Sequence, residues 1–263
     1  MRRFGSVRNI FLVVLSFVSP SCFAYFQPDE ANLNPAGFGT ADTLKFGELL
    51  FAPQGWIGLG AGNKLSVVWD WMAATDTSPA GYIRYRFGNP NVALAIESYV
   101  NYHPKQVDVQ RPQFIVGQRD SQSWLRLNFS GKLSDSMRLH AFVGETLDQY
   151  QRYSPNGGND FEEKLLQNDY TFDYGFAYEW TATQAIKFHV NWSAGDNFLL
   201  FKQIPHKKML VAGVQFIPFP AQVLPFLSKI RIELNMMYVW MPIANYQGPT
   251  YFAPVIYWQW MGI

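Results

Sequence analysis

The chain has little cysteine and little charge. Among its 263 residues there is one cysteine, Cys22, and Asp, Glu, Lys and Arg together make up 16% of the composition. Typical soluble domains hold about 25% charged residues, so something other than water is expected to cover much of the surface. A single cysteine excludes a disulfide framework. The formal net charge of +1 also argues against a nucleic-acid partner, which requires a concentrated basic face.

Long apolar runs are scarce too, and the clearest one lies at the N-terminus. There a basic segment, an apolar run and a small-residue site follow one another in the order of a secretory signal peptide. These parts are Arg2, Arg3 and Arg8, then residues 10–18, then Pro20 and Cys22-Phe23-Ala24. We therefore predict a signal peptide over residues 1–24. Cleavage after Ala24 would remove Cys22 and three arginines, leaving an exported chain without thiols and with the formal charge lowered from +1 to −2. The alternative is a lipoprotein signal acylated at Cys22, although Ser19 and Pro20 stand where such signals carry an aliphatic and a small residue.

No second segment qualifies as a membrane helix. The one other long apolar stretch, residues 211–227, is interrupted by Pro218, Pro220 and Pro225. Backbone in lipid must satisfy its hydrogen bonds internally, so a membrane protein without helices has to be a closed β-barrel.

What the chain has instead is alternation with a period of two, most clearly over residues 170–192. In the segment 170–180 every second residue is Tyr, Phe or Trp, and the residues between them are Thr, Asp, Gly, Ala and Glu. The segment 186–192 alternates in the same way. Because successive side chains of a strand point to opposite faces, both segments are predicted strands with one apolar and one polar face. Alternating segments of about ten residues with aromatic ends are typical of transmembrane barrels, whose apolar face meets lipid.

The same alternation, together with turn residues, predicts an all-β, antiparallel, up-and-down transmembrane barrel of about twelve strands. The strands are expected near residues 44–52, 55–62, 64–73, 80–88, 92–102, 113–130, 136–146, 170–180, 184–193, 208–217, 228–241 and 250–262. The barrel would span residues 44–263, preceded by a periplasmic lead-in or partial plug over residues 25–43. Long loops are expected at 103–112, 147–169, 194–207 and 242–249, with a bulge or projection near 119–122. The sequence signal for the first hairpin, which would turn at Pro53-Gln54, is weak. A barrel of ten strands with an N-terminal plug is therefore the alternative.

In its signal, alternating strands, aromatic strand ends and final amphipathic strand 251–263, the chain resembles a bacterial outer-membrane β-barrel of the small porin-like kind. The resemblance implies a cell outer-membrane location, contact with its lipids and lipopolysaccharide, and insertion by the barrel-assembly machinery; the oligomeric state stays open. A basic cluster would suit lipopolysaccharide phosphates. It consists of Lys202, His206, Lys207 and Lys208. Such barrels usually end in Phe or Trp, whereas this chain ends in Ile263. A secreted soluble β-sandwich is the competing class.

With the apolar parity facing lipid, the opposite parity carries ionisable side chains into the interior. These are Asp70, Arg84, Arg86, Glu97, Arg126, Arg138, His140, Asp173, Glu179, Lys187, His189, Arg231 and Glu233. Apart from the two histidines, six are basic and five are acidic. Aromatic residues at the strand ends are predicted to form belts at the two membrane interfaces. These are Trp180, Trp192, Tyr238, Trp240, Trp258 and Trp260.

Such an interior allows two functions. A wide barrel would be a passive channel for small polar solutes or ions, which we favour. A narrow or plugged one would be a closed structural or adhesion barrel that acts through its external loops. A third function, a lipid-modifying hydrolase, is suggested only by His189, Asn191 and Ser193 on one strand. His189 and Ser193 are four residues apart, which is about 13 Å along a strand and too far for a base and its nucleophile. We therefore expect no catalytic residue and, since no His or Cys spacing suits zinc, no metal or other cofactor.

Overall fold

The computed structural model describes nine segments of the chain, residues 40–53, 55–71, 80–102, 118–155, 161–183, 185–195, 207–219, 225–240 and 251–262. Side chains are described over the same ranges except at 102, 118–122, 148–155, 161–169, 207 and 251–253. The predicted signal peptide and residues 25–39 of the lead-in lie outside the described residues. Within the nine segments, no helix is long and apolar enough to cross a membrane.

Twelve antiparallel strands follow one another around a closed barrel, and β1 completes the ring by pairing with β12. Their bounds are β1 (Leu49–Ala52), β2 (Trp56–Gly62), β3 (Leu65–Asp70), β4 (Ala80–Gly88), β5 (Val92–Tyr102), β6 (Gln118–Ser134), β7 (Met137–Pro155), β8 (Phe161–Thr183), β9 (Ile186–Gly195), β10 (Lys207–Phe216), β11 (Ile230–Trp240) and β12 (Tyr251–Gly262). A short 3-10 helix, η5 (Leu227–Lys229), precedes β11. The predicted twelve-strand antiparallel barrel is confirmed, and the ten-strand alternative is wrong.

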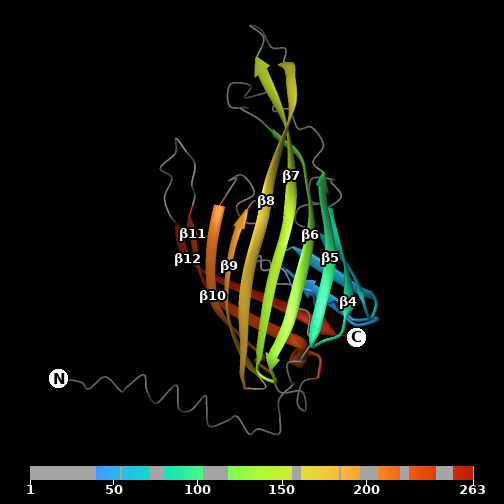
Figure 1. Ribbon diagram of the computed structural model, residues 1–263, viewed down its shortest axis with the longest axis vertical. Helices are drawn as coiled ribbons and strands as arrows, with labels where there is room; N and C mark the ends of the chain where they lie inside the picture. Colours follow the sequence, from blue (N-terminus) through green and yellow to red (C-terminus); the bar gives the residue numbers. More distant parts are fainter. Residues whose placement is uncertain are drawn as a thin grey trace, which may run out of the picture.

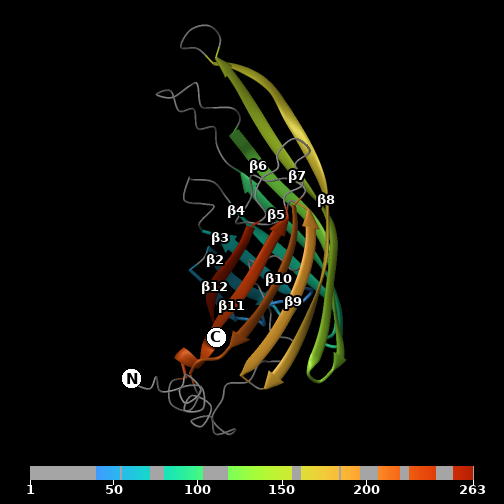
Figure 2. The ribbon, with the colours of Figure 1, turned by 90° about the vertical axis from the view of Figure 1, so that its left-hand side faces the viewer.

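The two ends of the barrel differ. The turn end carries the short connections at 63–64, 89–91 and 135–136, and β1 begins there beside the end of β12. The loop end carries the longer connections that follow β3, β5 and β9. Figure 1 shows the turn end at the bottom and the hairpin of β7 and β8 extending well beyond its neighbours at the loop end. The strands are inclined to the long axis (Figure 2), as closure of a sheet into a barrel requires.

Side chains alternate between the interior and the outer surface along each strand. On β4, Arg84 and Arg86 are 4% and 8% exposed, whereas Ile83 and Tyr85 are 53% and 44% exposed. A soluble sheet buries its apolar residues, and this barrel presents them on its outside instead.

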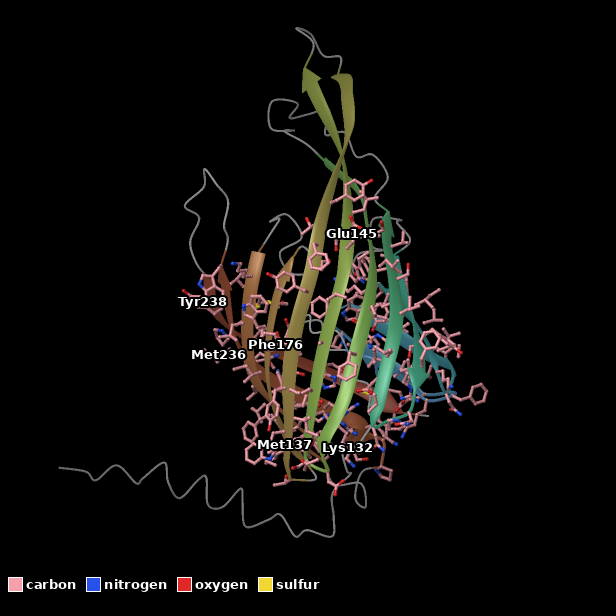
Figure 3. The ribbon with its side chains drawn as sticks, viewed as in Figure 1. Lys132, Met137, Glu145, Phe176, Met236 and Tyr238 are labelled. Atoms are coloured by element: carbon pink, nitrogen blue, oxygen red, sulfur yellow. The ribbon has the colours of Figure 1, made fainter. Side chains whose placement is uncertain are left out.

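The outer apolar surface has a visible limit on β7. Met137 near the turn end and Val143 further along are exposed apolar residues of the outer face. Glu145, also on the outer face, lies closer to the loop end (Figure 3). Phe176 on β8 and Met236 on β11 are among the exposed side chains labelled in the same view. On β7 the outer face is therefore apolar from Met137 to Val143, and Glu145 is the next outward residue.

The structure corrects three predicted boundaries. β7 and β8 stay paired as far as Pro155 and Phe161, so most of the loop predicted at 147–169 is strand. The sequence missed this because backbone pairing continues where the apolar alternation stops. β6 ends at Ser134, several residues later than predicted, and its register with β7 shifts between Arg119 and Ser121, where a bulge was expected. β1 begins at Leu49 rather than near residue 44, because Leu44 lies in the interior and residues 45–48 form a turn between it and the strand.

Candidate functional site

The predicted ionisable residues lie in the barrel interior. Twelve of them are 8% exposed or less, and the side chain of Arg138 is 11% exposed. The twelve are Asp70, Arg84, Arg86, Glu97, Arg126, His140, Asp173, Glu179, Lys187, His189, Arg231 and Glu233. Many of them belong to three networks that can be followed from strand to strand around the wall.

The first network lies midway along the barrel and joins β4, β5, β6 and β8. Cross-strand register sets Arg84 opposite Glu97, and Glu97 opposite Arg126. The Arg84 Nε donates to Glu97 Oε2 at 2.7 Å, and Arg84 Nη2 lies 2.5 Å from the same oxygen. Arg126 Nη1 lies 3.7 Å from Glu97 Oε1, and its Nη2 lies 3.7 Å from Asp173 Oδ2. Thr146 donates to the Asp173 carboxylate from the intervening strand. Acids and bases thus alternate along the wall.

The second network lies nearer the turn end and runs from β6 to β9. Ser130 Oγ is 2.8 Å from His140 Nδ1, and His140 Nε2 is 3.1 Å from Glu179 Oε2. Lys187 Nζ lies 3.8 Å from the same carboxylate oxygen. Serine, histidine and carboxylate occur in this order in hydrolases. Here, however, Ser130 Oγ accepts a hydrogen bond from the Ala41 N–H at 2.8 Å and Ser130 is fully buried. Ser130 therefore holds a neighbouring segment in place and is not an accessible nucleophile.

The third network joins β9, β10 and β11. His189 Nε2 lies 2.8 Å from Asn235 Oδ1 and 3.4 Å from Glu233 Oε1. The Glu233 carboxylate accepts hydrogen bonds from Asn235 Nδ2 at 2.6 Å and from Gln215 Nε2 at 3.2 Å. Buried polar groups are stable only with such partners, and here the partners come from strands along one side of the barrel.

Two glycines allow these networks to pass over an intervening strand. A Cβ on Gly144 of β7 would lie 2.5 Å from Arg126 Cγ, in the path between Arg126 and Asp173. A Cβ on Gly213 of β10 would lie 1.8 Å from Asn235 Oδ1 and 2.8 Å from His189 Nε2. Without side chains at these inward positions, strands that are not direct neighbours are connected.

A short segment that precedes β1 lies inside the barrel. Residues Thr40–Leu44, here called the inserted segment, are between 0% and 2% exposed. Its backbone is held by side chains of the wall. The Leu44 N–H donates to Ser66 Oγ at 2.7 Å, the Ala41 N–H donates to Ser130, and Arg84 Nη1 donates to the Asp42 carbonyl at 3.0 Å. Among the described residues, no backbone-to-backbone hydrogen bond joins Thr40–Leu44 to a strand. The segment is therefore not part of the barrel ladder.

The inserted segment brings a buried acid to the wall. Arg138 Nη1 donates to Asp42 Oδ2 at 2.6 Å, and Nη2 donates to Asp42 Oδ1 at 2.9 Å. The alternation predicts six interior bases and five acids; Asp42 supplies a sixth acid, with 0% exposure. It was missed because Asp42 lies in a lead-in rich in Asn, Pro and Gly, which follows no strand pattern. With the histidines neutral, the six basic side chains of the described interior are matched by six acidic ones only when the segment, with Asp42, is in place.

Small residues on the inner wall make room for this segment. Ala41 packs against Ala93 and Ala95 of β5. A Cβ on Gly60 of β2 would lie 1.7 Å from the Lys45 carbonyl oxygen, so the chain directly after the segment runs against a position without a side chain. The wall is shaped to accommodate a peptide at this place.

The interior also contains aromatic residues outside the predicted set. Tyr99 and Trp124 stack with ring centroids 3.7 Å apart and planes 9° from parallel. Trp124 Nε1 donates to Glu97 Oε1 at 3.0 Å, and the Arg126 guanidinium lies over the Trp124 ring at 4.2 Å. Tyr99 has the same parity as Glu97 on β5, so the alternation did contain this signal. These rings pack beside the mid-barrel network.

The aromatic residues predicted at the membrane interfaces lie on the outer face. Trp180, Trp240 and Trp258 are 43%, 37% and 39% exposed. Those nearer the turn end are Trp180, Trp258 and Trp260, and those nearer the loop end are Trp192, Tyr238 and Trp240. Trp260 Nε1 also donates to the Phe226 carbonyl at 3.0 Å.

Other candidates from the sequence contribute less. His189, Asn191 and Ser193 share the inner face of β9 and are all buried. Of the basic cluster, Lys208 is exposed at the loop end of β10; Lys202, His206 and the Lys207 side chain lie outside the described part. In that part no group of three or more His, Cys, Asp or Glu residues is placed to hold a metal ion.

Comparison of the chain with protein-family models finds no match, and comparison with curated proteins finds none either.

Proposed function

We propose that this protein is an outer-membrane channel for small polar solutes or ions, closed in the present state by its inserted segment. The observation that carries the proposal is the position of Thr40–Leu44: inside the barrel, and held by side chains instead of by a strand ladder. Such a segment can leave without breaking any strand pairing. The proposal assigns no catalytic residue and no cofactor.

The interior networks support a channel wall. The contacts of all three networks join strands that are neighbours or one strand apart. These networks extend from Arg84 to Asp173, from Ser130 to Lys187 and from His189 to Glu233. These side chains pair along the wall, and the inserted segment packs inside it. A wall of alternating acids and bases suits a passage for polar solutes.

The outer face supports the location. Exposed apolar residues cover it, and a charged residue facing lipid at mid-bilayer would cost about 2–4 kcal/mol. Together with the signal-like N-terminus, this favours the outer membrane, with its lipids and lipopolysaccharide as surroundings and the barrel-assembly machinery as the partner during insertion.

Reversible tethering of the inserted segment tests the proposal. The Ala41 N and Ser130 Oγ are 2.8 Å apart, so the double variant Ala41→Cys/Ser130→Cys places two thiols within reach of a disulfide. The exported chain is expected to hold no other thiol. In planar bilayers the oxidised protein should stay closed, and the reduced protein should give ohmic steps. Each molecule is its own control, because oxidation and reduction change only the tether. Absence of conductance in the reduced, folded protein would contradict the channel.

A second candidate function, a closed structural or adhesion barrel, is favoured by one specific observation. The paired part of β7 and β8 extends beyond the other strands at the loop end (Figure 1). A hairpin of this length offers an external surface without any need for conduction. A folded protein that never conducts, reduced or oxidised, would support this function instead.

A further inference from the structure

The Asp42 carboxylate occupies a site that the barrel wall builds. Both of its oxygens are bound by Arg138, at 2.6 and 2.9 Å, and Thr40 Oγ1 donates to Oδ2 at 3.0 Å. A planar guanidinium that binds two oxygens at once matches a carboxylate in shape and charge. Arg138 thus recognises the carboxylate as a group, whereas the Thr40 contact comes from the inserted segment itself.

The wall groups that hold Asp42 and its neighbour belong to three different strands. Arg138 of β7 binds the Asp42 carboxylate, Arg84 of β4 binds the Asp42 carbonyl, and Ser130 of β6 accepts from the Ala41 N–H. The inserted segment makes no backbone hydrogen bond to a strand among the described residues. When it leaves, the three wall groups remain where the strands hold them.

Departure of the segment would also leave the site with excess positive charge. Arg84 keeps its ion pair with Glu97, but Arg138 loses the carboxylate that binds both of its Nη atoms. The two Nη atoms that bound the Asp42 oxygens keep the geometry that fits a carboxylate. An anion from solution therefore has the chemistry to take the place of Asp42.

We propose that Arg138, with Arg84 and Ser130 beside it, forms a binding site for small organic carboxylates, and that the inserted segment blocks this site with a carboxylate of its own. A carboxylate solute displaces Asp42 from Arg138 and so favours the state in which the segment is out. The proposal rests on the proposed function, because it names the solute class of the same channel.

Thiol accessibility measures this displacement without any current. Ala41 is fully buried in the inserted segment, so in an Ala41→Cys variant a small cationic thiol reagent reacts only when the segment is out. Succinate is the probe, and potassium chloride of equal ionic strength is the reference. We expect succinate to raise the labelling rate about tenfold, within the range typical of coupling between two ligands.

Two arginine variants, each made in the Ala41→Cys background, separate the site from general charge. In Arg138→Gln the labelling rate should be high from the start and unaffected by succinate. Arg231→Gln removes another interior arginine, which lies on β11 and donates to the Ser228 and Ile230 carbonyls, and should respond to succinate as the parent does. The proposal is overturned if succinate leaves the parent's labelling rate unchanged, or if Arg138→Gln responds as strongly as the parent.

Conductance of the same variants distinguishes the two proposals. If succinate changes the labelling rate but the protein never conducts, the carboxylate site is supported and the channel is rejected. Conductance that appears when the segment is released, without any response to succinate, would keep the channel and reject the carboxylate site. A thiol at position 41 that is never labelled in any variant would reject both.

Discussion

Arg138 and Asp42 are 96 positions apart in the chain and are joined by two hydrogen bonds of 2.6 and 2.9 Å inside the barrel. Arg138 belongs to the wall and Asp42 belongs to the segment that enters it. This pair therefore connects the barrel to an element that the barrel does not need for closure. Its strength determines how firmly the inserted segment is held.

The first prediction concerns the stability of this pair. Asp42→Asn and Arg138→Gln should each lower the free energy of unfolding by about 3 kcal/mol, the lower end of the range for a broken buried pair. The lower end applies because the Arg138 side chain keeps 11% exposure. The double variant should lose clearly less than the sum of the two, and urea unfolding in detergent measures all three. Strict additivity would show that the two residues do not interact.

The second prediction uses two glycines of β2. The Cβ introduced by Gly60→Ala would lie 1.7 Å from the Lys45 carbonyl oxygen, whereas a Cβ on Gly62 would meet no atom within 4 Å. In the Ala41→Cys background, Gly60→Ala should push the chain before β1 away from the wall and raise the rate of thiol labelling at position 41. Gly62→Ala should leave that rate unchanged. Equal labelling of both variants would show that the segment does not depend on this close approach.

The sequence predicts the strands of the barrel wall much better than it predicts the inserted segment inside them. Strict alternation around Asp173 and Tyr174 predicts both the strand and the face of each residue, because one buried face fixes the register. Alternation carries no information on Asp42, which lies in an irregular segment and meets Arg138 only through the closed fold. The projecting part of β7 and β8 was missed for a related reason: backbone pairing beyond the apolar surface requires no particular side-chain pattern.

The third prediction tests which side chains face outward. Leu125 and Leu127 are 60% and 45% exposed, whereas Arg126 between them is 6% exposed. Cysteines at 125 and 127 should react with a lipid-soluble thiol reagent and be slow with a charged one. A cysteine at 126 should react with neither while the segment is in place, and with the charged reagent once Asp42→Asn weakens its attachment. Reaction of position 126 with the lipid-soluble reagent alone would reverse the assignment of the two faces.

The last prediction concerns the network that joins β9 to β11 over β10. In Gly213→Ala the new methyl group would lie 1.8 Å from Asn235 Oδ1 and 2.8 Å from two atoms of the His189 ring. Overpacking of this kind costs about 1–3 kcal/mol, and here it also separates His189 from Asn235 Oδ1, now 2.8 Å away. Removing the obstructing amide should relieve the clash, so Gly213→Ala should be much less harmful in an Asn235→Ala background than in the parent. Unfolding free energies of the two single variants and the double variant form the cycle that measures this rescue. If Gly213→Ala costs the same in both backgrounds, the empty position on β10 is not what allows the histidine and the amide to meet.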